Sequence, residues 1–492
     1  MKPILKSKGI NESEKYLSDL AERTFLSLWS FPNIFRKPGT ELSDLLVVYG
    51  QDIIIFSDKD IGWSDGIDTK AAWKRWYKKA ILAGANSTNS AARWIREHPQ
   101  RLFTDAANKE RAPFRLEEIK NPRIHLVSIC SGVDKIVKLH YKDRSGTFML
   151  SPYIEGDDHM NKCGEHGYPI FAVGDVLPQK DFVHIFSREA ISCVMTEFDT
   201  ISDFIKYLEW RREGFRKKKF GICAGEEELV AVYWKQMQYT GWDLSKIYGP
   251  RASNHSLAIV GGLFHELSFD PNYLEWKARC VESQFWDDLI QEFASHVITG
   301  CVPKVADINP SFQMSERVLR FMASENRDRR IYLSMQFKTM LERSVDQRAD
   351  RYVRKLPPVT YSDKHSYVFM AATHHPDIHG DYEAYREQRI NAIGAYCLDL
   401  LHQFPTIDHA VGITIDTWGR VSGRVNSSGD VMVVEREDFD EGRLDYLNKM
   451  RDALEIVPLD LEVINQKIKR NEKRLRQDLK RRQHQRKPAF RI

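Results

Sequence analysis

The stretch "GTELSDLLVVYGQDIIIFSDKDIGW", residues 39–63, contains two strongly apolar runs with charged residues at both outer ends. The runs "LLVVY" (45–49) and "IIIF" (53–56) are separated by "GQD", a composition typical of a tight turn. β-branched and aromatic residues favour strands, and runs without polar alternation favour strands that are buried on both faces. The stretch therefore predicts a β-hairpin in a sheet that helices cover on both sides.

The charged side chains stand at one end of this hairpin. Asp44 opens the first predicted strand, and Ser57 and Lys59 lie near the end of the second. Side chains alternate along a strand, so Ser57 and Lys59 share a face while Asp58 points away, and antiparallel pairing makes Asp44 and Lys59 neighbours. Two readings are open. One is a salt bridge at the sheet end. The other is a hydrolytic site, because carboxylates bind Mg²⁺ and a lysine can assist an attacking water.

The whole chain predicts a mixed α/β fold in four parts. Residues 1–220 alternate helix and strand patterns, residues 221–358 are mainly helical, residues 359–455 give an α/β unit, and residues 456–492 form a basic helical tail. In the first part we predict helices at 14–29, 70–97 (one helix or two) and 200–219, and further strands at 123–130, 135–141, 147–153 and 181–186.

The order of acid, hairpin and lysine resembles the signature of the PD-(D/E)XK, or restriction-endonuclease-like, nuclease superfamily. That signature has an acid at the start of one strand and acid-x-lysine on the next, and a preceding helix often supplies a glutamate. Asp44 matches the first acid, Lys59 the lysine, and Glu22 in "LAERTFL" the helix glutamate. The resemblance covers about residues 14–130. It implies a mixed sheet flanked by helices that hydrolyses nucleic-acid phosphodiester bonds, more readily DNA than RNA, with Mg²⁺ or Mn²⁺.

Ser57 departs from this signature, because the family has Asp or Glu two positions before the lysine. Another carboxylate must then complete the metal site, and Glu22, Glu41 and Asp58 are the candidates. Asp58 needs a bulge to reach the metal, so we rank Glu22 first and Glu41 close behind. The alternative is that catalysis is lost, and that the chain is a nucleic-acid-binding or assembly subunit built on a decayed nuclease fold.

Basic segments supply the predicted nucleic-acid contacts. "WKRWYKKAI" mixes cations with aromatic residues that can stack on bases, "RREGFRKKK" ends a helix, and the segment from Lys467 to Arg491 has twelve Lys or Arg against two acids. In each case the alternative is an ordinary amphipathic or solvated helix whose aromatics pack on the sheet. The predicted contact residues are Lys74, Arg75, Lys78, Lys79, Arg211, Arg212, Lys217, Lys218, Arg474, Arg481 and Arg482.

Composition restricts the remaining classes of function. The 492 residues are 42% hydrophobic, and no apolar run approaches the ~20 residues of a membrane span, which favours a cytoplasmic protein. Seven scattered cysteines without a CxxC pair favour free thiols. The chain has neither GxxxxGK[ST] nor a GxGxxG motif that opens a helix, so an ATP-driven step requires a partner ATPase. The sequence leaves homo-oligomerisation open, and the nuclease resemblance makes bacterial anti-phage defence a natural context.

Overall fold

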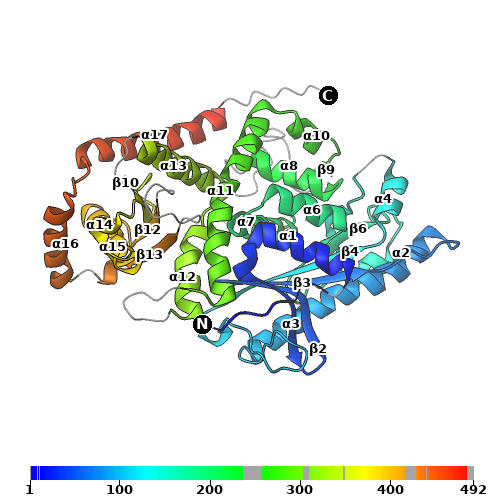
Figure 1. Ribbon diagram of the computed structural model, residues 1–492. Helices are drawn as coiled ribbons and strands as arrows, with labels where there is room; N and C mark the ends of the chain where they lie inside the picture. Colours follow the sequence, from blue (N-terminus) through cyan, green and yellow to red (C-terminus); the bar gives the residue numbers. More distant parts are fainter. Residues whose placement is uncertain are drawn as a thin grey trace.

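The computed structural model describes residues 2–7, 9, 11–142, 145–236, 258–302, 310–346, 350–416, 428–438 and 440–484. These residues form a mixed α/β structure, as the sequence predicts (Figure 1). Among them, no helix combines the length and the apolar character needed to cross a membrane. All seven cysteines are unpaired, which confirms the prediction of free thiols.

The predicted hairpin lies inside a five-stranded sheet with the order β1-β2-β3-β4-β7. The first three strands pair antiparallel, whereas β4 and β7 continue the sheet in parallel. Leu45 pairs with Phe56, so the two apolar runs face each other in the predicted register. The strands are β1 (Ser30–Lys37), β2 (Thr40–Tyr49), β3 (Asp52–Asp60), β4 (Arg123–Ser131) and β7 (Val183–Phe186).

Helices cover both faces of this sheet. On β3, Ile54 and Phe56 pack in a core with α1 (Glu12–Trp29), whereas Ile53 and Ile55 pack in a second core with the helices that follow the hairpin. Those helices run continuously from α2 (Thr69–Tyr77) through a π-helical turn (Lys78–Leu82) into α3 (Ala83–Glu97). Burial on both faces explains why the strands are apolar at consecutive positions.

One of the predicted elements differs in the structure. Residues 135–141 form most of helix α4 (Asp134–Tyr141) and not a strand, because a short apolar run can serve either element. The strand expected at 147–153 is β5 (Met149–Glu155), which belongs to a second sheet with the order β6-β5-β8-β9. That sheet contains strands from both sides of position 220, where the sequence predicted a boundary between two parts of the chain. Its other strands are β6 (Ala172–Asp175), β8 (Ile222–Cys223) and β9 (Ala258–Ile259).

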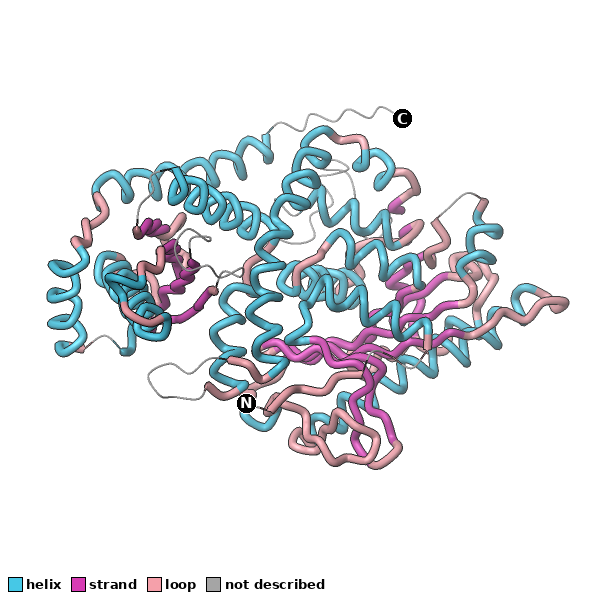
Figure 2. The backbone as a smooth tube through the Cα atoms, in the orientation of Figure 1, coloured by secondary structure: helices cyan, strands magenta, loops and turns pink. Residues whose placement is uncertain are grey.

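A helical layer separates the N-terminal sheet from a C-terminal one, as the two magenta regions of Figure 2 show. In the C-terminal sheet, with the order β10-β11-β12-β13, β11 and β12 are parallel and α15 connects them, so this region contains an α/β unit as predicted. The remaining helices are α5 (Asp158–Asn161), α6 (Arg188–Glu197), α7 (Ile201–Arg216), α8 (Glu226–Gln236), α10 (Leu263–Ser268), α11 (Pro271–Thr299), α12 (Phe312–Ala323), α13 (Arg327–Asp346), α14 (Pro376–His379), α15 (Tyr382–Gln403), α16 (Glu441–Leu454) and α17 (Leu461–His484), and the strands are β10 (Arg351–Leu356), β11 (His365–Ala372), β12 (His409–Asp416) and β13 (Gly429–Glu435).

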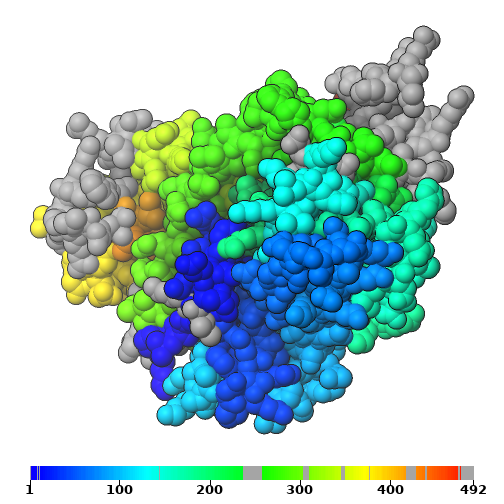
Figure 3. Space-filling view, turned by 90° about the vertical axis from the view of Figure 1, so that its right-hand side faces the viewer, coloured from blue at the N-terminus to red at the C-terminus, as the bar shows by residue number. Residues whose placement is uncertain are grey.

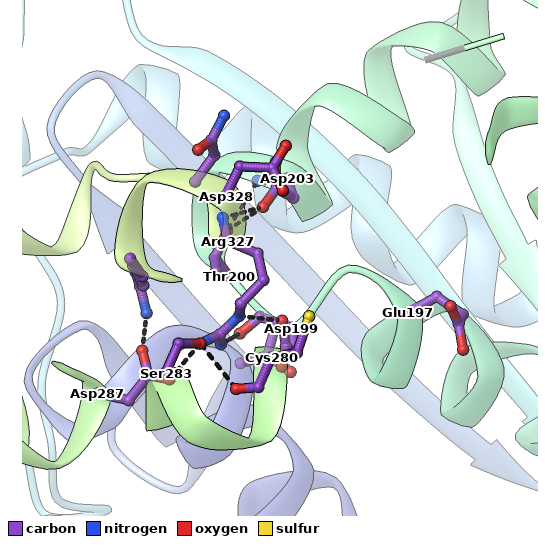
Figure 4. Close-up of polar contacts among 12 residues, drawn as sticks. Glu197, Asp199, Thr200, Asp203, Cys280, Ser283, Asp287, Arg327 and Asp328 are labelled. Carbon is purple, nitrogen blue, oxygen red and sulfur yellow. Dashed lines mark hydrogen bonds and ion pairs between the residues drawn. The ribbon is translucent and has the colours of Figure 1, made fainter. Parts of the chain in front are cut away.

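A buried arginine fastens the helical layer to the N-terminal part. The Arg327 guanidinium at the start of α13 lies 2.8 Å from an oxygen of Asp199, which follows α6, and 2.7 Å from one of Asp287 on α11 (Figure 4). Its backbone N–H donates to Asp203 of α7. Four segments therefore meet at one residue, which ties the helical layer to the N-terminal part.

Candidate active site

Asp44 and Lys59 lie on the same face of adjacent antiparallel strands. β2 begins at Thr40, four residues earlier than predicted, so Asp44 lies inside the strand. It is the residue next to Leu45, which pairs with Phe56 of β3. Its carboxylate accepts a hydrogen bond from the backbone N–H of Asp58. The Lys59 stem lies against Gly84 of α3, where an added Cβ would be 3.4 Å from Lys59 Cγ. The predicted proximity of the two side chains is supported by the effect of the Lys59 charge, which lowers the pKa of Asp44.

The simple salt-bridge reading is not supported. None of the ion pairs among the described residues joins Lys59 to a carboxylate, although both side chains are only half-buried. Burial raises the pKa of Asp44 above its ordinary value, against the opposing effects of the Asp58 N–H and the Lys59 charge. The site thus keeps a carboxylate that is costly to ionise beside a lysine that does not bind it directly.

Two further acids lie beside Asp44, linked by one buried asparagine. Asn33 of β1 donates its amide N–H groups to Glu41 at 2.6 Å and to Glu14 at 3.2 Å. Burial raises the pKa of Glu41, and the charges of Asp44 and Glu14 raise it further. Glu41 thus belongs to this acidic group, but it lies in strand β2 and not in the loop that the sequence suggested.

The helix glutamate was wrongly predicted as Glu22. The Glu22 side chain is exposed, and its charge raises the pKa of Lys6. Glu14 is the α1 acid whose charge reaches Asp44. The signal was present in the sequence, because positions 14, 17, 21, 25 and 28 form one helical face and Glu22 lies about 100° away from it.

Asp58 faces the opposite side of β3, as predicted. Its carboxylate accepts a hydrogen bond from Ser13 in the first turn of α1, whereas Lys59 packs on α3. No bulge is present at this position, since β3 and β4 keep a regular register from Asp52 to Asp60. Asp58 therefore does not replace the acid missing at Ser57.

The donors of this group suit a hard divalent cation. They are carboxylate oxygens, the ligands that Mg²⁺ prefers, and Mg²⁺ commonly takes only one or two carboxylates and completes its shell with waters and substrate phosphates. Within the described ranges, no set of three His, Cys, Asp or Glu side chains lies close enough to hold a metal by itself. Asp44 and Glu41 could supply at most two of the ligands of such an ion, and waters or substrate oxygens would complete its shell.

The basic residues predicted to bind nucleic acid have different fates. On α2 and the π-helical turn, Arg75, Lys78 and Lys79 are exposed and Lys74 is half-buried. Trp73, Trp76 and Tyr77 are at most 2% exposed and pack in the core under the sheet. The prediction that these rings stack on bases is therefore wrong, and the amphipathic-helix alternative holds for them.

The predicted contact at Arg211 is also wrong. Its side chain is buried and pairs with Glu226 at 2.9 Å, with Tyr207 on the same carboxylate. Within the same basic run, Lys217 pairs with Glu213 and Lys218 with Glu155. Arg212 is exposed on α7 and Arg474 is exposed on α17, whereas the side chains of Arg481 and Arg482 lie outside the described residues.

No protein-family model, no curated protein and no solved structure matches this chain.

Proposed function

We propose that this chain is a metal-dependent nuclease that hydrolyses phosphodiester bonds in nucleic acid. The observation that carries the proposal is that Asp44 and Lys59 lie on one face of two adjacent strands and form no ion pair with each other. The resemblance of residues 14–130 to PD-(D/E)XK nucleases makes DNA the first substrate to test and a cytoplasmic defence role the context.

The chemistry follows from the side chains. A bound Mg²⁺ or Mn²⁺ would polarise the scissile phosphate and lower the pKa of an attacking water. Asp44 and Glu41 supply oxygens that can hold it. Glu14, which shares the Asn33 amide with Glu41, adds a further negative charge beside them. Lys59 orients the water and offsets the charge that builds on the phosphate as the new P–O bond forms and the bond to the leaving oxygen breaks.

The second candidate is a non-catalytic nucleic-acid-binding or assembly subunit. Ser57, which is 3% exposed, stands where the family has an acid, and it shares a face of the sheet with Asp44 and Lys59. A hydroxyl there cannot supply the negative charge of a carboxylate. In this second reading the protein has the same fold and binding surface but does not catalyse hydrolysis.

The test uses the purified full chain with plasmid, linear duplex, single-stranded DNA and RNA, each with Mg²⁺, Mn²⁺ or EDTA. We expect cleavage with either metal and none with EDTA. Asp44→Ala and Lys59→Ala should each lower the rate at least ~100-fold, the size typical of losing one group that stabilises the transition state.

Matched controls are Asp60→Ala, at the exposed end of β3, and Lys162→Ala, whose ammonium pairs with Asp158. Both should cut at the wild-type rate. Unchanged cutting by both site variants would remove the proposed site. Binding of nucleic acid without cleavage under every condition would favour the second candidate.

A further inference from the structure

Three cations surround one tryptophan beside the β1-β2 hairpin. Trp94 lies in the last turn of α3, Arg36 and Lys37 end β1, and Arg101 lies in the segment after α3. The cationic groups lie 5.7, 5.3 and 5.9 Å from the Trp94 ring, in the order Arg36, Lys37, Arg101. Trp94 and Arg36 are half-buried, and Lys37 and Arg101 are exposed. We call these four residues the Trp94 cluster.

The cations of the Trp94 cluster form no ion pair within the described part of the chain. None of the ion pairs there includes Arg36, Lys37 or Arg101, and the buried Nε of Arg36 has no hydrogen-bond partner there. Other cations nearby do have partners, since Arg96 pairs with Asp181. An aromatic ring attracts cations through its quadrupole but, unlike a carboxylate, leaves their net charge in place.

The backbone holds the cluster in position before any ligand arrives. Phe35 and Phe103 exchange two backbone hydrogen bonds of 2.9 Å, which tie β1 to the segment after α3, and Gly39 N–H donates to Ala106 at 2.8 Å. Arg101 N–H donates to the carbonyl of His98, which closes the turn after α3. A preorganised site loses less conformational entropy on binding.

The cluster lies on the strand hairpin that carries the candidate active site. Lys37 pairs with Thr40, and Asp44 follows Thr40 by four residues in β2, which is at most ~13 Å of strand. At 3.4 Å per nucleotide in a duplex, this span corresponds to about four nucleotides. Figure 3 shows the hairpin and the segment after α3 side by side at the lower edge of the molecule.

We propose that the Trp94 cluster binds the phosphodiester backbone of nucleic acid and positions the strand that enters the candidate active site. The choice of a nucleic acid as ligand is based on the proposed function. The contacts are to phosphates and not to base edges, so binding is independent of sequence.

The test measures binding without catalysis. Fluorescence anisotropy of a labelled DNA duplex, in EDTA, gives the affinity between 50 and 300 mM salt for the wild type and for the triple variant Arg36→Gln, Lys37→Gln, Arg101→Gln. Each duplex phosphate contact contributes ~0.9 to the slope of log affinity against log salt, so losing three should flatten the slope by about 2 to 3. The affinity at 100 mM salt should fall at least ~10-fold.

Two further variants separate binding from folding. Lys37→Gln with Arg101→Gln changes exposed side chains only and should flatten the slope by about 2. The matched control is the triple variant Arg115→Gln, Lys162→Gln, Lys217→Gln, which removes the same charge from cations that pair with Glu118, Asp158 and Glu213. The control should keep the wild-type slope.

The outcomes distinguish this proposal from the nuclease proposal. A flattened slope for the cluster variants supports the cluster even if the wild type never cleaves any substrate. Equal slopes for the wild type and both cluster variants overturn it even if the wild type cleaves DNA. A slope that falls equally in the control triple also overturns it, because the effect would then reflect net charge alone.

Discussion

Asn33 is the residue around which the candidate site is organised. It is 1% exposed, and its φ of 50° lies in the left-handed region, which asparagine tolerates better than most residues. Its amide nitrogen binds Glu41 and Glu14, and its amide oxygen accepts a hydrogen bond from Ser7 at 2.6 Å. One neutral side chain thus holds two acids close together without cancelling their charge.

The rank order of the helix glutamates can be tested directly. Because the Glu14 charge reaches Asp44 and Glu41, Glu14→Gln should lower the cleavage rate more than ~10-fold at limiting Mg²⁺, with partial recovery at high Mg²⁺. Glu22→Gln, at an exposed position on the same helix, should stay within about twofold of the wild type. Both are measured as rate against Mg²⁺ concentration. The reverse order would place the metal on the Glu22 side of α1.

The pKa of Asp44 predicts a stability cost that a cation relieves. Because burial raises the pKa of Asp44 above its ordinary 3.8, the folded state retains a proton that the unfolded state has lost. In EDTA, stability should therefore fall as pH rises above ~4 through the raised pKa. Asp44→Asn keeps the acceptor for the Asp58 N–H and lacks the charge, so it should melt at a higher temperature than the wild type at pH 7 in EDTA.

Thermal melts between pH 4 and 7.5, with EDTA and with Mg²⁺, check this expectation. Mg²⁺ should raise the melting temperature of the wild type at pH 7 more than that of Asp44→Asn. A lower melting temperature for Asp44→Asn in EDTA would mean that the carboxylate stabilises the fold and is not held there for a ligand.

Sequence periodicity predicted that Asp44 and Lys59 share a face, but it did not predict Glu14 or the asparagine that links Glu14 to Glu41. Alternation along β3 correctly separated Lys59 from Asp58, because a strand has only two faces. Glu14 and Asn33 were missed because they reach the site through tertiary contacts from α1 and β1. Arg211 was misassigned because its sequence neighbours are basic, whereas its ion-pair partner Glu226 lies fifteen residues away.

At the scale of elements, the contact between α3 and the strands depends on one glycine. A Cβ on Gly84 would lie 2.1 Å from the Oγ of Ser128 on β4 and 3.4 Å from Lys59 Cγ. The π-helical turn just before it contacts both β3 and β4, and such turns are frequent at functional sites. This helix can therefore approach the strand ends closely enough to support Lys59.

Gly84→Ala should destabilise the protein despite the better helix propensity of alanine. Overpacking costs about 1–3 kcal/mol, which exceeds or offsets the ~1 kcal/mol that Ala gains over Gly in a helix. Ser128→Ala removes the clashing oxygen, so Gly84→Ala in that background should be neutral or stabilising. Denaturant unfolding of the four proteins in this double-mutant cycle measures the coupling.

Gly394 of α15 gives the matched control. A Cβ there would make only ordinary contacts, the nearest at 3.5 Å to Met432, so Gly394→Ala should stabilise by up to about 1 kcal/mol. If Gly84→Ala behaved in the same way as Gly394→Ala, α3 would not be held tightly against β4.

The element types that the sequence predicted well are those with strong periodicity. The hairpin and the helices at 14–29 and 70–97 are present because their apolar faces match the burial that the sheet imposes. Residues 135–141 were assigned wrongly because seven residues are too few to separate the two periods. The pairing of β5 with β8, and of β8 with β9, could not be predicted, because it depends on segments far apart in the chain.

At the scale of the whole molecule, one core connects the two large sheets. It runs from Leu17 of α1, through Trp286 of α11 and Phe337 of α13, to Phe369 of β11 and Ile413 of β12. The helical layer is thus packed on both sides, and through this core it connects the sheet that carries the candidate active site to the C-terminal unit. The four predicted parts of the chain do not each have a separate core.

Arg327 provides the test of this arrangement. Arg327→Met keeps much of the apolar stem but leaves Asp199 without its guanidinium partner, whereas Asp287 retains Arg330. Breaking a buried pair by removing one partner costs about 3–5 kcal/mol, and we expect the lower end because Asp199 is 27% exposed. Arg317→Met, which removes a pair between an arginine that is 56% exposed and Glu435, should cost less than ~1 kcal/mol.

Hydrogen exchange, measured peptide by peptide, shows which elements lose stability in the Arg327→Met variant. Because the core is continuous, Arg327→Met should lower the protection of β3 and of β11 together, although the substitution lies in neither sheet. Protection lost only around α6, α11 and α13 would mean that the sheets unfold independently of the helical layer. In that case the C-terminal unit would have to influence the candidate active site through a shared ligand and not through packing.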